Sequence, residues 1–325
     1  MTTARTVPVT TEMDGDELDH EDAWRMARKV GLTRLVTDSF VRFRYGDGFT
    51  HSRALALQAA LAVVPFMLAL TGLAADIDQE RPARVVADTI QAVSPGSGEQ
   101  DALSNAVVGG TSSQEAGEIA LGFGLVFALL SMAAAMAQVE RGLNRIYGIE
   151  RDRHAVAKYG RAAVMTAILA APLAAGFLLL VAGGAFADAM RTEYGWSETA
   201  ALVWNVGRWP LGLVLLVFAI AVVLDHAPRR RQPSLGWLAL GSGIAVMLIM
   251  AATAVLAVYV YVGDSFGDVY GPLAGIFALL IWSLMSSVAL FYGAAVCAQL
   301  EACRAGDPDP AEADPGRPQS MQVPD

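Results

Sequence analysis

The sequence predicts an all-α integral membrane protein that forms a bundle of six transmembrane helices. Two features of the composition point to this class: 54% of the 325 residues are hydrophobic, and only 17% are charged. Soluble domains carry about 25% charged residues. A third feature is that the apolar residues gather in six long runs separated by polar loops. Together these features exclude an ordinary soluble domain.

The six apolar runs are each long enough to cross the hydrocarbon core of a membrane, which takes roughly 20 helical residues. Lipid offers no hydrogen-bonding partner to a bare backbone, so each run is predicted to be a helix. The last two exceed the minimum length, so they are expected to tilt or to project beyond the bilayer. The runs are 54–75, 119–139, 162–187, 204–224, 235–262 and 270–300.

The transmembrane domain is predicted to cover residues 31–303. It follows a polar N-terminal tail at 1–30 that is expected to be partly disordered. It precedes a cytoplasmic tail at 304–325, and the high Pro and Asp content of this tail predicts disorder.

Short amphipathic helices are expected outside the spans. One region is the N-terminus, where residues 21–44 are basic and have a helical pattern. The other is the first extracytoplasmic loop, 76–118, in which Val86, Ile90 and Val93 share one side of a short helical stretch.

The Lys and Arg residues are distributed unevenly between the two sides of the predicted bundle. All but four of the 23 lie on the side of both termini. Loops rich in Lys and Arg stay in the cytoplasm. Both termini are therefore predicted to be cytoplasmic, in a protein that crosses the cytoplasmic membrane several times. The four exceptions are Arg81, Arg84, Arg191 and Arg208.

Few polar side chains fall near or inside the predicted spans, and these are the candidates for lining a transport path. Gln58 in the first span and Gln138 in the second lie away from charged ends. Pro65 frees a backbone carbonyl one turn earlier in the first span. Glu140 and Asn144 are placed at the cytoplasmic mouth of this path. Interfacial salt bridges are the alternative explanation for Glu140, because water reaches the ends of the spans.

Three glycines at a spacing of four residues open the sixth span: Gly267, Gly271 and Gly275. Small residues at this spacing let helices approach closely, and close packing is what holds helices together in lipid. We therefore expect a helix-packing interface here. A glycine face that lines a substrate path is the alternative.

The sequence carries no motif of a soluble enzyme, such as a phosphate-binding loop, a GxSxG turn or a CxxC pair. His51, His154 and His226 fall at the cytoplasmic edges of different helices, without metal-ligand spacing. Cys297 and Cys303 are six residues apart, which places them on different faces of a helix. We expect no catalytic residue, no metal, no cofactor and no nucleic-acid partner.

Three sequence blocks carry a resemblance to a known family. Ala54–Pro65 is a run of small and apolar residues that ends in proline, and Glu140–Tyr147 has an acid followed by Leu-Asn-x-Ile-aromatic. Tyr270–Ala274 leads through Trp282 to the last Gly-Ala pair. In this order and spacing the blocks resemble the YihY/BrkB family of bacterial inner-membrane proteins, formerly labelled ribonuclease BN. The residues that match the family motifs are Glu140, Asn144, Tyr147, Tyr270 and Gly271.

The resemblance implies a role in the transport of lipids or lipopolysaccharide precursors and in envelope integrity. The chain has Leu57 and Ala295 where the family commonly has Tyr and Glu. The leading hypothesis is that the bundle transports or flips a lipid or another amphiphile. A non-transporting envelope scaffold is the alternative, and a membrane-bound ribonuclease is a remote third. Membrane lipids are the expected partners, and a homo-oligomer or contacts with envelope proteins stay open.

Overall fold

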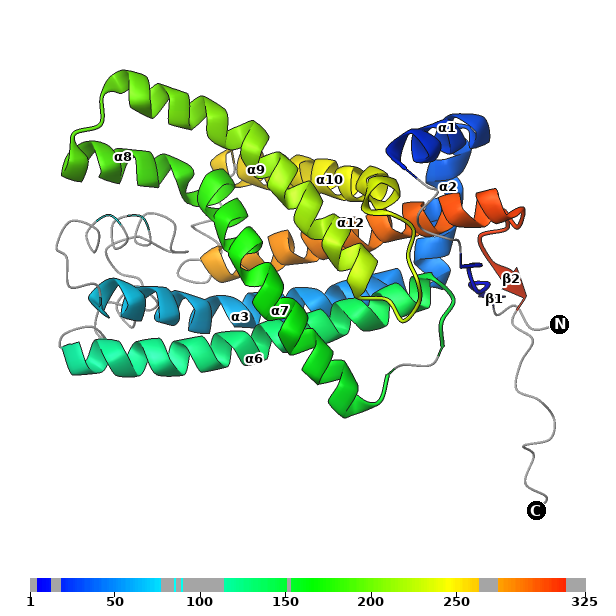
Figure 1. The fold of residues 1–325 in the computed structure, drawn as a ribbon, viewed down its shortest axis with the longest axis horizontal. Helices are drawn as coiled ribbons and strands as arrows, with labels where there is room; N and C mark the ends of the chain where they lie inside the picture. The colour runs from blue at the N-terminus through cyan, green and yellow to red at the C-terminus, as the bar shows by residue number, and fades with distance from the viewer. Residues whose placement is uncertain are drawn as a thin grey trace, which may run out of the picture.

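The computed structural model describes residues 5–12, 19–76, 85, 89, 114–150, 153–262 and 274–313. Within them the chain is helical except for two very short strands and the connections (Figure 1). In chain order the elements are β1 Arg5–Thr6, α1 His20–Val30, α2 Leu32–Tyr45, α3 Gly48–Asp76, α6 Gln114–Ile146, α7 Ala155–Phe177, η2 Leu178–Ala182, α8 Gly183–Tyr194, α9 Glu198–His226, α10 Leu235–Val262, α12 Ala274–Ala305 and β2 Glu312–Ala313.

Five described segments are long and apolar enough to cross a membrane, which confirms the prediction of a helical protein with several candidate spans. The first predicted span, 54–75, is helical within α3 but is not among these five. The count of six spans therefore stays a prediction. The five segments are Leu121–Ile146, Val156–Tyr194, Glu198–His226, Leu235–Tyr259 and Gly275–Ala305.

The long helices form one elongated bundle (Figure 1). α3 packs along α6, and α12 contacts both α3 and α10. α7 and α9 contact each other and cross this layer obliquely (Figure 1). Most of the expected helices of the first extracytoplasmic loop, 76–118, lie outside the described residues.

Both ends of the described chain lie at the same end of the bundle (Figure 1). There β1 and β2 pair antiparallel, with Arg5 opposite Ala313 and Thr6 opposite Glu312. The basic segments that precede α3, follow α6 and precede α10 meet at this end too (Figure 1). This arrangement agrees with the predicted cytoplasmic side, and we call it the terminal end. The orientation in the membrane itself stays a prediction.

The most deeply buried large side chains also gather at the terminal end. Trp237, Tyr147, Phe43, Phe291 and Leu300 have at most 1% of their surface exposed. Along α6, α7 and α9, by contrast, many large apolar side chains are exposed. Exposed apolar surface of this extent marks contact with a membrane or partner. The protein core therefore sits at the terminal end, and much of the remaining helix surface is suited to lipid.

A pair of glycines brings α10 and α12 into close contact. A Cβ atom built on Gly293 would lie 2.5 Å from the carbonyl oxygen of Gly241, and one on Gly241 would clash with Gly293 in return. Only residues without a side chain allow this approach. The predicted packing glycines lie elsewhere: Gly275 is half-buried, and Gly267 and Gly271 lie outside the described residues.

The third predicted span, 162–187, is interrupted by the π-helix η2. Side chains of α9 bind two backbone carbonyls in and next to this π-helix. Trp204 Nε1 donates to the carbonyl of Gly183 at 2.7 Å, and Arg208 Nη1 donates to that of Leu179 at 3.2 Å. Such bonds are what makes irregular backbone tolerable at membrane depth.

Candidate functional site

Buried charged and polar side chains form a network at the terminal end. Arg230 Nη1 lies 2.8 Å from Glu301 Oε2, in an ion pair that is almost wholly buried. The hydroxyl of Tyr147 donates to Glu301 Oε1 at 3.4 Å. The Arg230 guanidinium also stacks over the Tyr147 ring, 4.6 Å from its centroid. With Arg42, which is fully buried beside them, these residues are called the buried ion network below.

Burial changes the proton affinity of Tyr147 and Arg42, which lie outside the candidate spans. It raises the pKa of the Tyr147 phenol well above its ordinary value, so the hydroxyl keeps its proton and can donate to Glu301. Burial lowers the pKa of Arg42 to about 10, so Arg42 is still charged at neutral pH. Arg42 is stabilised by two carbonyl oxygens: Nη1 donates to Ala298 at 3.0 Å, and Nη2 donates to Pro8 at 3.1 Å.

The N-terminal segment, residues 5–12, crosses the network and bonds to it along its length. The Thr10 amide donates to the carbonyl of Tyr147 at 3.0 Å. Arg230 Nη2 donates to the carbonyl of Thr11 at 3.1 Å. The approach is so close at Pro8 that residue 148 must be glycine: a Cβ on Gly148 would lie 2.5 Å from the Pro8 carbonyl oxygen. This segment covers the buried ion network at the terminal end.

The two candidates for a cytoplasmic mouth are bonded to neighbouring loops. Glu140 Oε1 lies 2.6 Å from Arg153 Nη1, and the Glu140 side chain is 3% exposed. Arg153 also donates to the carbonyls of Ala227 at 3.1 Å and Pro228 at 3.2 Å. Asn144 Oδ1 accepts from the backbone amide of the residue after Pro228 at 2.8 Å. Both residues therefore join the end of α6 to the loop after α9.

Gln138 lies two residues before Glu140 in α6 and faces α3. Its Nε2 is 2.7 Å from Nδ1 of His51, and both side chains are largely buried. This places one of the two path candidates on the contact between α3 and α6. It also gives His51 a partner that is not a metal.

Gln58, the other path candidate, is half-buried in α3. Its Oε1 atom is buried and accepts no hydrogen bond from the described residues. Pro65 is also half-buried, two turns further along the same helix. The remaining family-motif residue, Tyr270, lies outside the described residues, as Gly271 does.

Sequence reasoning missed the roles of Arg42 and Arg230. Nothing in the sequence distinguishes Arg230 from the other basic residues of its loop. Arg42 carried a readable signal, because it follows Leu35 by seven residues and precedes Phe43, and all three are buried on one side of α2. A charged residue at a buried helix position predicts a partner in the core.

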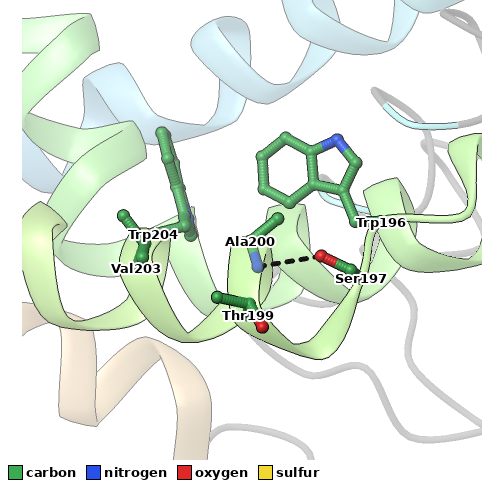
Figure 2. Close-up of a pocket in the computed structure, with 6 residues that line it drawn as sticks. All are labelled: Trp196, Ser197, Thr199, Ala200, Val203 and Trp204. Atoms are coloured by element: carbon green, nitrogen blue, oxygen red, sulfur yellow. Dashed lines mark hydrogen bonds between the residues drawn. The ribbon is translucent and has the colours of Figure 1, made fainter.

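An open hollow of about 500 Å³ lies beside the start of α9, far from the terminal end. Figure 2 shows the residues that line it. Trp196 and Trp204 line it, with ring centroids 6.1 Å apart. Ser197 caps α9 by accepting from the Ala200 amide at 3.2 Å. Tryptophan is common where helices leave the hydrocarbon layer, so this position explains the hollow without a ligand.

Within the described residues, no three His, Cys, Asp or Glu side chains come together as a metal site. His226 Nδ1 lies 2.9 Å from the carboxylate of Asp225, and His51 faces Gln138. Cys297 is buried and Cys303 half-buried, and neither forms a disulfide in this part of the chain.

Apolar helices with exposed lipid-type surface, closed at one end by buried ion pairs, define a helical membrane protein with several spans. The chain belongs to the family described as Virulence factor BrkB, whose sequence profile matches residues 39–317. This confirms the family resemblance that the three sequence blocks indicated. No solved structure matches the chain.

Three curated relatives are similar to the chain over most of its length. The "Putative ribonuclease-like protein YfkH" of Bacillus subtilis is 24% identical over 265 residues, which cover 82% of this chain and 94% of the relative. A "UPF0761 membrane protein" of Chromohalobacter salexigens is 24% identical over 277 residues, covering 83% of this chain and 63% of the relative. The "UPF0761 membrane protein IL2447" of Idiomarina loihiensis is 26% identical over 220 residues, covering 66% and 72%.

Proposed function

We propose that the protein moves a lipid or another amphiphile between the two leaflets of the cytoplasmic membrane. The observation that carries this proposal is the buried Oε1 atom of Gln58, which accepts no hydrogen bond from the described residues. Buried polar atoms in proteins are nearly always bonded. An unbonded one in a helix of this apolar character is suited to meet a polar group that passes through the membrane.

The position of Gln58 supports a path between α3 and α6. His51 faces Gln138 of α6, and Gln58 follows His51 by seven residues, or about two helical turns. Gln58 therefore lies on the same side of α3 as His51, about 10 Å further along the helix. A headgroup that entered between these helices would meet His51 and Gln138 first and Gln58 next.

The bonds at the terminal end indicate which side of such a path is closed. Glu140 with Arg153, and Glu301 with Arg230, join helix ends to loops across this end. A moving headgroup needs these ion pairs to separate. We therefore interpret this arrangement as the state that is closed on the cytoplasmic side.

The test is the transbilayer movement of a fluorescent lipid in vesicles that contain the purified protein. The wild type should accelerate it, and Gln58→Leu should slow it roughly two- to tenfold, as expected for the loss of one hydrogen bond. Gln138→Leu should add to the effect. Leu57→Gln is the matched control, because it places the same side chain on an exposed neighbouring position and should leave the rate unchanged.

The outcomes separate transport from the other two functions. If the wild type does not accelerate any of several headgroup types, the envelope scaffold is favoured. The closed terminal end, built from both ends of the described chain, would then be a rigid platform. RNA cleavage, which the printed name of the Bacillus relative suggests for that protein, is expected to be absent here. Cleavage that accompanies the purified protein and is lost in variants of His51, His154 or His226 would contradict this.

A further inference from the structure

α2 carries a row of apolar side chains that the described part of the chain leaves uncovered. Leu32, Val36 and Phe40 are 55%, 57% and 47% exposed. Their spacing of four residues places them in line along one side of the helix. The neighbouring side of α2 is buried, with Leu35 and Phe43 in the core. α2 therefore has two apolar sides, and only one of them packs on the protein.

The direction of α2 sets this row across the bundle. In Figure 1, α2 lies roughly at right angles to the course of α3, α6 and α12, at the terminal end. The hydroxyl of Tyr292, on α12, donates to the Val36 carbonyl at 3.1 Å and fixes α2 in this direction. If α12 spans the membrane, α2 lies along its surface.

The exposed row continues into the surface that faces lipid. The ring of Phe40 lies 6.3 Å from that of Phe49, in an edge-on contact. Phe49 is exposed in the first turn of α3, and Leu57 and Leu61 are exposed further along the same helix. The exposed row of α2 is therefore continuous, through Phe49, with the exposed apolar surface of α3.

Exposed cations lie beside this apolar surface. Arg44 is one turn beyond Phe40 on α2, and Arg28 and Lys29 lie at the end of α1 that adjoins α2. None of the three has a carboxylate partner among the described residues. Arg28 stacks over the ring of Trp24 at 4.9 Å, and Trp24 is itself exposed. Tryptophan and basic residues together are typical of the interface between membrane and water.

The other charges of these two helices are compensated or lie further away. Arg25 pairs with Asp22 at 2.9 Å, and Arg34 pairs with Asp38 at 3.3 Å. Glu21 stands in the first turn of α1, at the opposite end from Arg28. Asp47, three residues after Arg44 in the turn that ends α2, is exposed. Among the described residues, Arg28, Lys29 and Arg44 outnumber it, so the net charge beside the apolar row is positive.

We propose that α2 is an interfacial anchor that binds anionic lipid of the cytoplasmic leaflet. Leu32, Val36, Phe40 and Phe49 insert at the level of the headgroups and upper acyl chains, as amphipathic helices do. Arg28, Lys29 and Arg44, which have no carboxylate partner among the described residues, bind the anionic headgroups. Each basic residue near such a surface is enough for about a fivefold local enrichment of anionic lipid. This inference does not depend on the proposed transport.

The experiment compares two positions on α2 in the full-length protein. Val36→Cys and Thr37→Cys are each labelled with bimane, in a background of Cys297→Ala and Cys303→Ser. The protein is placed in nanodiscs of equal parts phosphatidylglycerol and phosphatidylcholine, with either one lipid or the other brominated. Thr37 is exposed on the polar side of the helix, so its label is the matched control.

The label at Val36 should be quenched by brominated lipid, and at least about twofold more by brominated phosphatidylglycerol than by brominated phosphatidylcholine. The label at Thr37 should instead be quenched by aqueous iodide. Salt at about 0.5 M should reduce the preference, because exposed charges are then screened. If the label at position 36 is quenched by iodide and not by brominated lipid, the proposal that α2 is an interfacial anchor is wrong. Shielding of Val36 from both quenchers would overturn it in favour of a second copy or another protein.

Paired charge variants test the anionic preference. Arg28→Gln with Arg44→Gln should abolish the preference for phosphatidylglycerol. Arg25→Gln with Arg34→Gln removes the same net charge from cations that are already paired, and should leave most of the preference. Equal quenching by both lipids in the wild type, or equal losses in the two variants, would contradict the assignment of the headgroup site.

Discussion

Arg230 and Glu301 face each other in the core of the terminal end, with Nη1 and Oε2 2.8 Å apart. Arg230 comes from the loop before α10, and Glu301 from the last turns of α12. Removing two charges from water costs several kcal/mol per ion, and their attraction offsets this only where further bonds are made. Tyr147 and the carbonyl of Thr11 supply those bonds. The ion pair therefore connects the end of α12, the loop before α10 and the N-terminal segment.

Breaking this pair from one side should destabilise the protein strongly. Glu301→Gln leaves the charge of Arg230 buried without its counterion, and we expect a loss of about 3–5 kcal/mol in the free energy of unfolding. Thermal unfolding in detergent measures it. Arg230→Met combined with Glu301→Met should recover most of the loss, because no unpaired charge remains. Glu312→Gln, at an exposed position, is the control. If Glu301→Gln alone were as stable as this control, the stabilising role of the ion pair would be disproved.

The contact between α10 and α12 makes a second prediction. Gly241→Ala places a methyl group against the backbone of Gly293, so the helices must separate and the folded yield and melting temperature should fall. Gly243→Ala, two residues away on the same helix, meets no atom within 4 Å. It should be at least as stable as the wild type, since alanine favours helix. Equal melting temperatures for the two variants would contradict the close contact between α10 and α12.

Gly148 links the third prediction to the N-terminal segment. Its φ of 77° is a conformation that disfavours side chains, and a Cβ there would also strike Pro8. Gly306 has a φ of 87° but meets nothing within 4 Å. Both changes to alanine cost about 1–2 kcal/mol in backbone strain, and only Gly148→Ala should also displace residues 5–12.

Limited proteolysis from the cytoplasmic side reads out this displacement. Cleavage near the N-terminus should be faster in Gly148→Ala than in Gly306→Ala, and in the wild type it should be slow. If both alanine variants are cleaved alike, the close approach of Pro8 does not hold the segment in place.

The helical segments could be predicted from the sequence because lipid leaves a bare backbone no other choice. The break at η2 could not be predicted, because no local pattern shows that Trp204 and Arg208 of α9 reach the carbonyls of Gly183 and Leu179. The packing glycines illustrate the same limit. Spacing of four residues drew attention to Gly275 and its neighbours, whereas Gly241 and Gly293 show their role only once α10 and α12 are side by side.

The candidate site shows the difference between local and long-range information. Gln58 and Gln138 are noticeable in the sequence because amides are rare in apolar runs. The structure places Gln138 where α3 and α6 meet, and the Oε1 atom of Gln58 is buried about two turns beyond His51 on α3. Their role in transport stays a prediction. The partner of Glu140 could not be deduced, because Arg153 reaches it across a loop. The buried ion network joins four separate elements, and no local pattern brings these together.

The last prediction concerns the orientation of the whole chain. The segments that carry most of the Lys and Arg residues lie at the terminal end, and the turn between α8 and α9 lies at the opposite end (Figure 1). Basic segments are retained in the cytoplasm, so topology reporters fused to any of them should report the cytoplasmic side.

Topology reporters fused after residues 155, 230 and 310 should therefore report the cytoplasm. Reporters fused after residues 100 and 195 should report the other side of the membrane. The fusion after residue 100 also tests α3 as a span, since its reporter can only be extracytoplasmic if α3 crosses. Immunoblots of each fusion control for differences in amount. A cytoplasmic signal after residue 100 would contradict the six-span prediction: it would leave five spans and place the two termini on opposite sides of the membrane, in conflict with the pairing of β1 with β2.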